Sequence, residues 1–212
     1  MTEDTAAKAA SLWDQRYGTP GFLFGTAPND YLASQRHLLR PGMRALAVAD
    51  GEGRNSVWLA RQGLRVDAFD VSSVAVGKAT RLASDAQVAV DFRVADCDAW
   101  RWEPAHYDVV AAIFVQFADP ALRARLFANI ITTLKPGGIL ILQGYTPKQL
   151  EYKTGGPGVL ENLYTEELLR TELGALDIVE LRSYEGNLDE GTQHAGRSAL
   201  IGLVGRKADA SR

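Results

Sequence analysis

A glycine turn between two apolar runs constrains this chain more than any other feature of its sequence. The run Ala45–Ala49 leads into Gly51 and Gly53, and the residues after them have the spacing of an amphipathic helix. A second apolar run, Val66–Phe69, then ends on Asp70. Two apolar runs joined by a turn and a helix are typical of parallel strands, which need a crossover connection. The segment 44–70 therefore predicts a βαβ unit.

The residues of this unit also indicate what it binds. Glycines let the backbone turn sharply and approach a ligand closely, and the amides at the start of the next helix favour polar or anionic groups. An acid at the end of the second strand, here Asp70, is the usual partner of ribose hydroxyls. A nucleoside-containing ligand is expected, although Gly-x-Gly also occurs in plain turns. Ser56 stands where the dinucleotide fingerprint has a third small residue, which disfavours nicotinamide and flavin cofactors.

Composition sets the class of protein. The 212 residues, 46% hydrophobic and 23% charged, fit one globular domain with a substantial core. The net charge of −3 disfavours nucleic acid as the main partner. No apolar stretch is long enough to span a bilayer, and the N-terminus lacks the pattern of a signal peptide, so we expect a cytoplasmic protein. Cys97 is the single cysteine, and the 3 histidines lack metal-ligand spacing, so neither a disulfide nor a metal is expected.

The alternation of helices and strands continues on both sides of the glycine turn. It predicts an α/β doubly wound sheet. We expect helices over 3–17, from Asn29 or Asp30 to His37, from Ser72 or Ser73 to 83, and over 119–134, with further strands over 88–95, 106–114 and 139–145. The aromatic loop between Trp13 and Leu32 is too apolar for a free tail and predicts a cover over another surface.

The last third of the chain has a different pattern. Residues 146–164 are irregular and rich in glycine and tyrosine, and Thr165 caps a short helix. Two strands over 176–188 and 198–207 are expected to form an antiparallel pair. His194 falls in the turn between these strands, where we expect it to face solvent.

Taken in order, the motifs resemble a known family. They are the glycine turn, Asp70 at a strand end, Ala95-Asp96-Cys97, Tyr107-Asp108-Val109-Val110, Leu134-Lys-Pro-Gly-Gly138 and the terminal hairpin. This order resembles the class I S-adenosylmethionine-dependent methyltransferases. The stretches W-D-Q-R-Y…F-G-T-A-P-N-D-Y-L and E-G-R-N-S-V-W-L-A are similar to the small bacterial tellurite-resistance/thiopurine methyltransferase-like group.

The resemblance implies a fold, a cofactor and a domain plan. The fold is a single-domain, Rossmann-like, seven-stranded and mostly parallel sheet with an antiparallel last strand. The cofactor is S-adenosyl-L-methionine and its product S-adenosyl-L-homocysteine. The domain is expected to span 1–212, with an N-terminal helical lid segment (1–40), a cofactor-binding core (44–145) and an acceptor-side segment with the terminal hairpin (146–207).

A cofactor site is implied as well, from the methionine part to the adenine and the sulfonium. The residues at the matching positions are Asp50, Gly51, Gly53, Asn55, Asp70, Val71, Asp96, Cys97, Phe114 and Gln116. Two positions depart from the family, because Ala47 stands where an acid is usual and Ala49 where a glycine is usual. Asp50 is then the candidate anchor for the cofactor's amino group. Cys97 is expected to fill space and use only its backbone.

The acceptor site is expected to contain residues from the N-terminal segment and from the last third of the chain. Candidate substrate residues are Arg16, Tyr17, Gln143, Tyr145, Tyr152 and Tyr164, with His194 the only candidate base and no residue assigned as catalytic. The predicted reaction is methyl transfer to a small molecule, by attack of an acceptor lone pair on the sulfonium methyl. A soft chalcogen nucleophile (a thiol, selenol or tellurite) is favoured, because a thiol is partly ionised at neutral pH and needs no strong base.

Two other functions remain open on the sequence. A nicotinamide-dependent oxidoreductase shares the glycine turn and Asp70, but not the irregular segment before a terminal hairpin. A non-catalytic S-adenosylmethionine-binding protein is made plausible by Ala47 and Ala49. For any of them we expect a monomer or homodimer that binds small molecules, with no nucleic-acid or membrane partner.

Overall fold

The structure is a computed structural model that describes residues 3–209. Contacts within the chain divide it into two compact units. Unit 1 comprises the residues up to Arg101 together with Glu190–Thr192, and unit 2 comprises Trp102–Asp189 and the residues from Gln193 onward.

Unit 1 contains the predicted βαβ arrangement. Its elements are α1 (Glu3–Tyr17), α2 (Asp30–Ser34), the 3₁₀ helix η1 (Gln35–Leu38), β1 (Arg44–Val48), α3 (Arg54–Arg61), β2 (Arg65–Asp70), α4 (Ser73–Asp85) and β3 (Val90–Val94). β2 pairs in parallel with β1 on one side and with β3 on the other, so that Ala47 lies beside Ala68 and Asp70 beside Val94. The strand, turn, helix and strand predicted over 44–70 are confirmed.

Side-chain caps set where the helices of unit 1 begin. Asn29 accepts a hydrogen bond from the Leu32 amide, and Ser72 accepts one from the Ala75 amide. These two residues are therefore the caps among the alternatives that the sequence left open. β3 is shorter than the predicted strand over 88–95, because the Val88 amide donates to the Ala83 carbonyl in the turn after α4.

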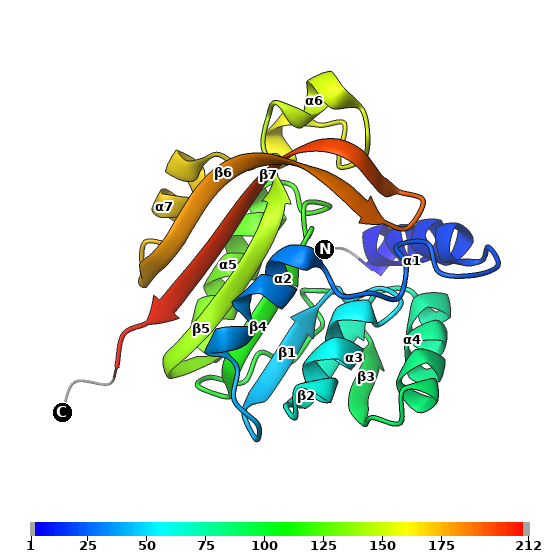
Figure 1. Ribbon diagram of the computed structural model, residues 1–212, viewed down its shortest axis with the longest axis horizontal. Coiled ribbons are helices and arrows are strands. Elements are labelled where there is room, and N and C mark those ends of the chain that lie inside the picture. The colour runs from blue at the N-terminus through cyan, green and yellow to red at the C-terminus, as the bar shows by residue number, and fades with distance from the viewer. Residues whose placement is uncertain (1–2, 210–212) are drawn as a thin grey trace. The chain divides into compact units, whose positions relative to one another are not determined.

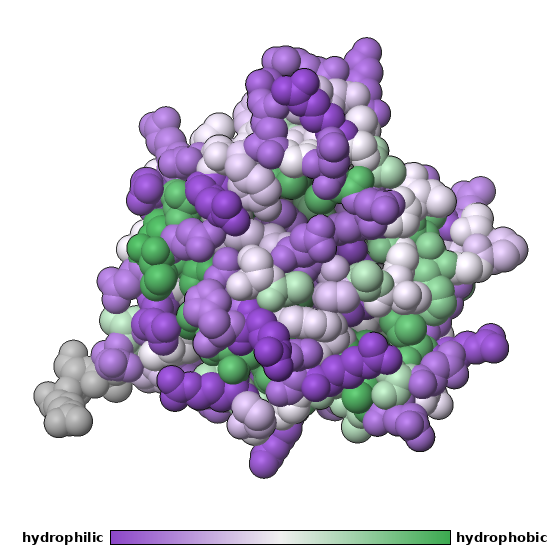
Figure 2. Space-filling view, viewed as in Figure 1, coloured by the Kyte–Doolittle hydropathy of each residue, from purple (hydrophilic) through white to green (hydrophobic). Residues whose placement is uncertain are grey.

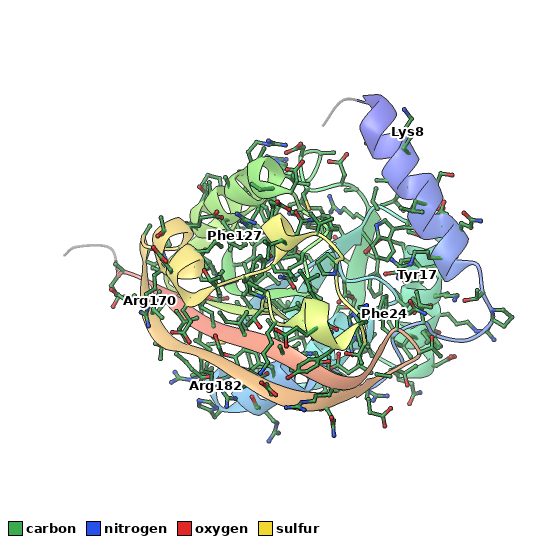
Figure 3. All side chains as sticks on the ribbon, turned by 90° about the horizontal axis from the view of Figure 1, so that it is seen from above. Lys8, Tyr17, Phe24, Phe127, Arg170 and Arg182 are labelled. Atoms are coloured by element: carbon green, nitrogen blue, oxygen red, sulfur yellow. The ribbon has the colours of Figure 1, made fainter. Side chains whose placement is uncertain are left out.

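Unit 2 carries the second half of the strands. Its elements are β4 (Tyr107–Ile113), α5 (Pro120–Thr133), β5 (Leu134–Tyr145), α6 (Gln149–Tyr152), the 3₁₀ helix η2 (Leu160–Asn162), α7 (Glu166–Glu172), β6 (Leu176–Glu190) and β7 (His194–Lys207). β4 is parallel to β5, and β5 is antiparallel to β7 from Ile139–Arg206 to Tyr145–Leu200. Phe127 of α5, labelled in Figure 3, is fully buried in the core of this unit.

Three elements of unit 2 differ from the prediction. Residues 135–138, which precede the predicted strand over 139–145, are a bulge inside β5, where the register with β4 jumps from Tyr107–Leu134 to Val109–Ile139. β6 and β7 are longer than the predicted strands and are drawn as long arrows in Figure 1. His194 is therefore the first residue of β7 and is buried, so the expectation that it faces solvent was wrong.

The seven strands have the order β3-β2-β1-β4-β5-β7-β6. This order confirms the predicted α/β doubly wound sheet, mostly parallel with an antiparallel last strand, β7. The face drawn in Figure 2 is mostly hydrophilic, with small hydrophobic patches. Within residues 3–209, no helix is both long enough and apolar enough to cross a membrane.

Candidate active site

The turn after β1 has a left-handed backbone at three positions. Gly51 and Gly53 have φ angles of 61° and 91°, and Ala49 has a φ angle of 47° although it carries a side chain. Residues with a β-carbon disfavour this region because the β-carbon approaches a carbonyl oxygen. Ala49, which replaces the usual glycine, therefore preserves the glycine-like turn at a cost in backbone energy.

The two glycines are also required by the space around them. A β-carbon on Gly51 would lie 2.7 Å from the hydroxyl oxygen of Tyr17, and one on Gly53 would lie 2.7 Å from the β-carbon of Ala79. Both distances are well below van der Waals contact. The turn is thus a cradle with room for backbone but not for side chains, which is what close approach to a ligand requires.

Asp70 holds this cradle from the end of β2. One carboxylate oxygen accepts from the Gly51 amide at 2.9 Å, and the other accepts from the Ser72 amide at 2.9 Å. The side chain is buried, and burial raises the pKa of Asp70 above its ordinary value, against the opposing effect of these two hydrogen bonds. The acid that the sequence predicted as a ribose partner therefore also fixes the glycine turn.

Asp50 lies in the same turn and is half-buried. Its carboxylate accepts from the Ser56 hydroxyl and from the Ser56 amide at 3.3 Å. Burial raises the pKa of Asp50 to about 7, while the hydrogen bonds from Ser56 oppose the shift. Ala47 is fully buried within β1 and carries no polar group, so the acids near the end of β1 are Asp50 and Glu52 of this turn.

Tyr17 covers the glycine turn from the end of α1. Its ring stacks on Trp13 at 5.5 Å between centroids and contacts the edge of Phe24 at 6.2 Å, and it is only 4% exposed. Figure 3 labels Tyr17, at the end of α1, and Phe24, in the loop that follows α1. Burial among acids raises the pKa of the Tyr17 hydroxyl far above its ordinary value. Arg16, the other predicted residue of this segment, is exposed and lies over the Trp13 ring.

The segment that contains Tyr17 is fastened by residues that the sequence reading missed. Asp14 accepts from the hydroxyls of Ser72 and Ser73 at the start of α4. Glu52, the middle residue of the glycine turn, accepts from the Leu23 and Phe24 amides and pairs with Lys78 at 2.8 Å. The position of Glu52 between two glycines could have marked it as a residue of the site, but no local pattern identifies the groups that it contacts.

The remaining predicted cofactor residues of unit 1 follow β2 and β3. Val71 is half-buried beside Asp70. One oxygen of Asp96 accepts from the Asp98 and Ala99 amides at 2.7 and 2.8 Å, so this residue caps the next turn. Cys97 is buried, and burial together with nearby acids raises the pKa of its thiol to about 12. A thiol of that kind fills space and does not react.

Asn55 and its neighbours form a second group that the sequence reading did not assemble. The side-chain oxygen of Asn55 accepts from the Asn29 amide at 2.9 Å. The side-chain amide of Asn29 donates to Glu190 at 2.8 Å, and Arg54 pairs with the other oxygen of Glu190 at 2.6 Å. Glu190 lies 136 residues from Arg54 in the sequence, so no local signal predicts this group.

In unit 2, Phe114, Tyr145 and His194 form an aromatic cluster. Phe114 stacks on Tyr145 at 4.7 Å, and the His194 ring meets Phe114 edge-on at 4.4 Å and Tyr145 at 5.8 Å. His194 is 9% exposed. Phe114 has a φ angle of 55°, a strained conformation of the kind that concentrates at functional sites. The structure therefore brings together three residues that the sequence singled out from distant positions.

The other predicted residues of unit 2 have structural partners. The side-chain amide of Gln116 donates to the carbonyls of Tyr145 and Asn162 and accepts from the Tyr145 amide, which uses both of its N–H donors. Gln143 is buried and donates to the Tyr184 hydroxyl. Both side chains thus have partners within the protein.

Tyr152 and Tyr164 lie apart from the aromatic cluster. The Tyr152 hydroxyl donates to Glu185 at 2.8 Å, in a network that also contains Arg197. Tyr164 is fully buried against Phe127, and burial raises the pKa of its hydroxyl. The structure gives both tyrosines a role in packing or surface pairing.

Comparison with known proteins identifies the domain. Residues 45–138 match the family described as a methyltransferase domain. Ubiquinone biosynthesis O-methyltransferases of Xanthomonas campestris pv. campestris are 34% identical over 144 residues, which is 66% of this chain and 58% of theirs. The chain therefore spans less than two thirds of the length of these curated relatives.

Solved structures show the same fold at low sequence identity. TehB from Haemophilus influenzae is 14% identical with a TM-score of 0.67, over 93% of this chain and 66% of that one. Magnesium protoporphyrin IX methyltransferase (ChlM) from Synechocystis PCC 6803, solved with bound S-adenosylhomocysteine, is 19% identical with a TM-score of 0.63, over 95% and 84% of the two chains. Residues 45–138 thus match a methyltransferase domain, and the solved structures share the fold of the chain.

Proposed function

We propose that the whole protein transfers a methyl group from S-adenosylmethionine to a small molecule. The observation that carries this proposal is the cradle of unit 1, in which the buried carboxylate of Asp70 fixes a glycine turn that leaves no room for a β-carbon. The bound cofactor would supply the electrophilic methyl group. Asp70 would hold the ribose hydroxyls, and Asp96, whose second oxygen is not engaged by the turn that it caps, would bind the adenine amine together with the Cys97 amide.

The cofactor assignment is tested by binding. Calorimetry should show that the protein binds S-adenosylhomocysteine and does not bind nicotinamide dinucleotides. Asp70→Ala removes a charge-assisted acceptor, so affinity should fall by roughly 1.5–3 kcal/mol. Equal affinity of the variant and the wild type would contradict the assignment of Asp70. Tight binding without turnover of any acceptor would favour a non-catalytic protein.

For the acceptor, we infer a hydroxyl group on a small aromatic molecule, with His194 as general base. This inference is supported by the burial of His194 against Phe114 and Tyr145, since a hydroxyl acceptor needs a positioned group to take its proton. Stacked rings also suit an aromatic acceptor. The Xanthomonas relatives, 34% identical, carry the name of an O-methyltransferase, which agrees with this choice.

A soft chalcogen acceptor is the second candidate. The aromatic surroundings of the same cluster favour a polarisable sulfur, selenium or tellurium atom, and a thiol is already partly ionised at neutral pH. The resemblance of the N-terminal stretches to the tellurite-resistance/thiopurine group points the same way. No base is then required, and His194 would only shape the pocket.

The two acceptors are separated by a single screen. Catechols, phenols, thiols, selenite and tellurite are offered with labelled cofactor to the wild type and to His194→Gln. Methylation of a phenol or catechol that falls by about 100-fold or more in the variant supports the base. Methylation of a thiol or tellurite that changes by less than about threefold in the variant supports the chalcogen reading and rejects a hydroxyl acceptor.

The remaining features of the proposal rest on the sequence. We propose a single domain over 1–212 with residues 1–40 as a lid segment, located in the cytoplasm and present as a monomer or homodimer. The net charge of −3 supports a small-molecule substrate over nucleic acid. Sedimentation with and without S-adenosylhomocysteine tests the oligomeric state.

A further inference from the structure

Arg54 is a buried cation, and only one of its two terminal guanidinium nitrogens has a hydrogen-bond acceptor within residues 3–209. It is the first residue of α3, and only 6% of it is exposed. One terminal nitrogen, Nη2, donates to Glu190 at 2.6 Å. The other, Nη1, is fully buried and has no hydrogen-bond partner among the described residues. Guanidinium groups stay protonated in proteins, so this buried donor cannot lose its requirement for an acceptor by titration.

The neighbouring side-chain acceptors already have other donors. One oxygen of Glu190 is taken by Arg54, and the other already accepts from the Asn29 side chain at 2.8 Å and from the Asp30 amide at 3.2 Å. The side-chain oxygen of Asn55 is occupied by the Asn29 amide. Each of these acceptor oxygens therefore already has at least one donor, whereas Nη1 of Arg54 has no acceptor in the part of the chain that the structure describes. A buried donor without a partner is costly and demands an explanation.

The first turn of α3, which begins at Arg54, adds backbone amide donors near the guanidinium group. Gly53 is its N-cap, has a left-handed backbone and offers no side-chain cap. Within the described residues, the Ser56 amide is the one early amide of this eight-residue helix with a side-chain acceptor, Asp50 at 3.3 Å. The positive end of a helix and an unused guanidinium nitrogen both favour an anion, and the planar fork of arginine matches a carboxylate.

We propose that Arg54 binds a carboxylate through its Nη1 atom, while Glu190 holds the guanidinium in place through Nη2. The carboxylate has two possible sources, the amino-acid part of the cofactor or a carboxylated acceptor. The proposal rests on the proposed function, because both sources are ligands of a methyltransferase. Arg54 is then a residue that binds a ligand, and Glu190 and Asn29 are positioning residues.

The test compares ligands that differ by one carboxylate. For the cofactor source, calorimetry compares S-adenosylhomocysteine with its decarboxylated form, which keeps the amine. For the acceptor source, turnover compares a phenol or thiol with its carboxylated analogue. The variant is Arg54→Gln combined with Glu190→Gln, which removes the cation without leaving a buried acid unpaired. Glu190→Gln alone tests the positioning role of Glu190, and the half-exposed Arg44→Gln is the matched control.

In the wild type, one of the two ligand pairs should show a preference for the carboxylated member of about 10-fold or more. The double variant should lose that preference and Glu190→Gln alone should lose part of it, whereas Arg44→Gln should keep it. Arg54→Lys, which retains the charge, should also keep part of it. An unchanged preference for both pairs in the double variant overturns the proposal, and so does an equal loss in Arg44→Gln. Failure of the wild type to bind S-adenosylhomocysteine in either form would instead reject the proposed function.

Discussion

Replacing Ala49 by glycine should stabilise this protein, although glycine usually destabilises a fold. Ala49 has a φ angle of 47°, a conformation that costs a residue with a β-carbon about 1–2 kcal/mol. Against that gain, glycine loses about 0.5–1 kcal/mol through its greater freedom in the unfolded chain. The half-buried methyl group of Ala49 contributes a further fraction of its burial energy. The net expectation is a stabilisation of about 0.5 kcal/mol.

The size of the backbone contribution can be isolated with two matched variants. Ala105 has a φ angle of 49° and is exposed, so Ala105→Gly lacks the burial contribution and should stabilise by about 0.5–1 kcal/mol. Ala60 lies within α3, where the backbone is right-handed, so Ala60→Gly should destabilise by about 1 kcal/mol. Ala49 and Ala105 share a left-handed backbone and differ in burial, whereas Ala49 and Ala60 are both half-buried and differ in backbone.

Urea unfolding followed by circular dichroism measures all three variants, with the midpoint compared at constant slope. The reasoning is refuted if Ala49→Gly lowers the free energy of unfolding as much as Ala60→Gly does. Because Ala49 already adopts the glycine-like turn, the affinity for S-adenosylhomocysteine should change by less than about threefold. A larger gain in affinity would show that the alanine distorts the cofactor cradle.

Three further predictions concern ionisable groups of unit 1. Burial raises the pKa of Asp50 to about 7, so the folded state binds more protons than the unfolded state between about pH 4 and pH 7, and the free energy of unfolding should fall as the pH rises through that window. In Asp50→Asn this fall should be smaller, as measured by urea unfolding at pH 5 and pH 8. Identical falls in the wild type and the variant would contradict the assignment. Lys78 donates to the carbonyls of Thr19 and Gly21 as well as to Glu52. Lys78→Met should therefore speed hydrogen exchange of the amides of residues 18–25 by about 10-fold or more. Unchanged exchange would mean that other contacts hold this loop. The Cys97 thiol, with its pKa raised to about 12, should react with iodoacetamide at pH 8 at least about 100-fold more slowly than free cysteine, and rapid labelling would show that it is accessible.

The sequence alone predicted the parts of the fold that depend on local pattern. The βαβ unit over 44–70 was predicted because apolar runs, glycines and helical spacing are read within a few neighbouring residues. The caps at Ser72 and Thr165 followed from the same short-range chemistry. The buried carboxylate of Asp70 was located correctly because its place at a strand end is fixed by that pattern.

Other features were decided by packing between residues far apart in the chain. Nothing near Gly51 in the sequence indicates that the Tyr17 hydroxyl fills the space of its missing β-carbon. His194 was expected in solvent because it falls in the turn between two predicted strands. It is buried because β7 begins earlier than its apolar pattern and places the ring against Phe114. Gln116 was read as a ligand contact, and its side chain is engaged by the backbone at Tyr145 and Asn162.

The division between what the sequence and the tertiary structure determined has a physical basis. Propensity, periodicity and turn chemistry act over a few residues, so they determine which segments become helices and strands. The partner of a buried charge is set by whichever group the folded chain brings within hydrogen-bond distance. Arg54 and Glu190 are 136 residues apart, and no local pattern indicates that they pair. The sequence thus determined the sheet and the glycine turn, and only the tertiary structure decided which side chains cover that turn and which buried donor lacks a partner among the described residues.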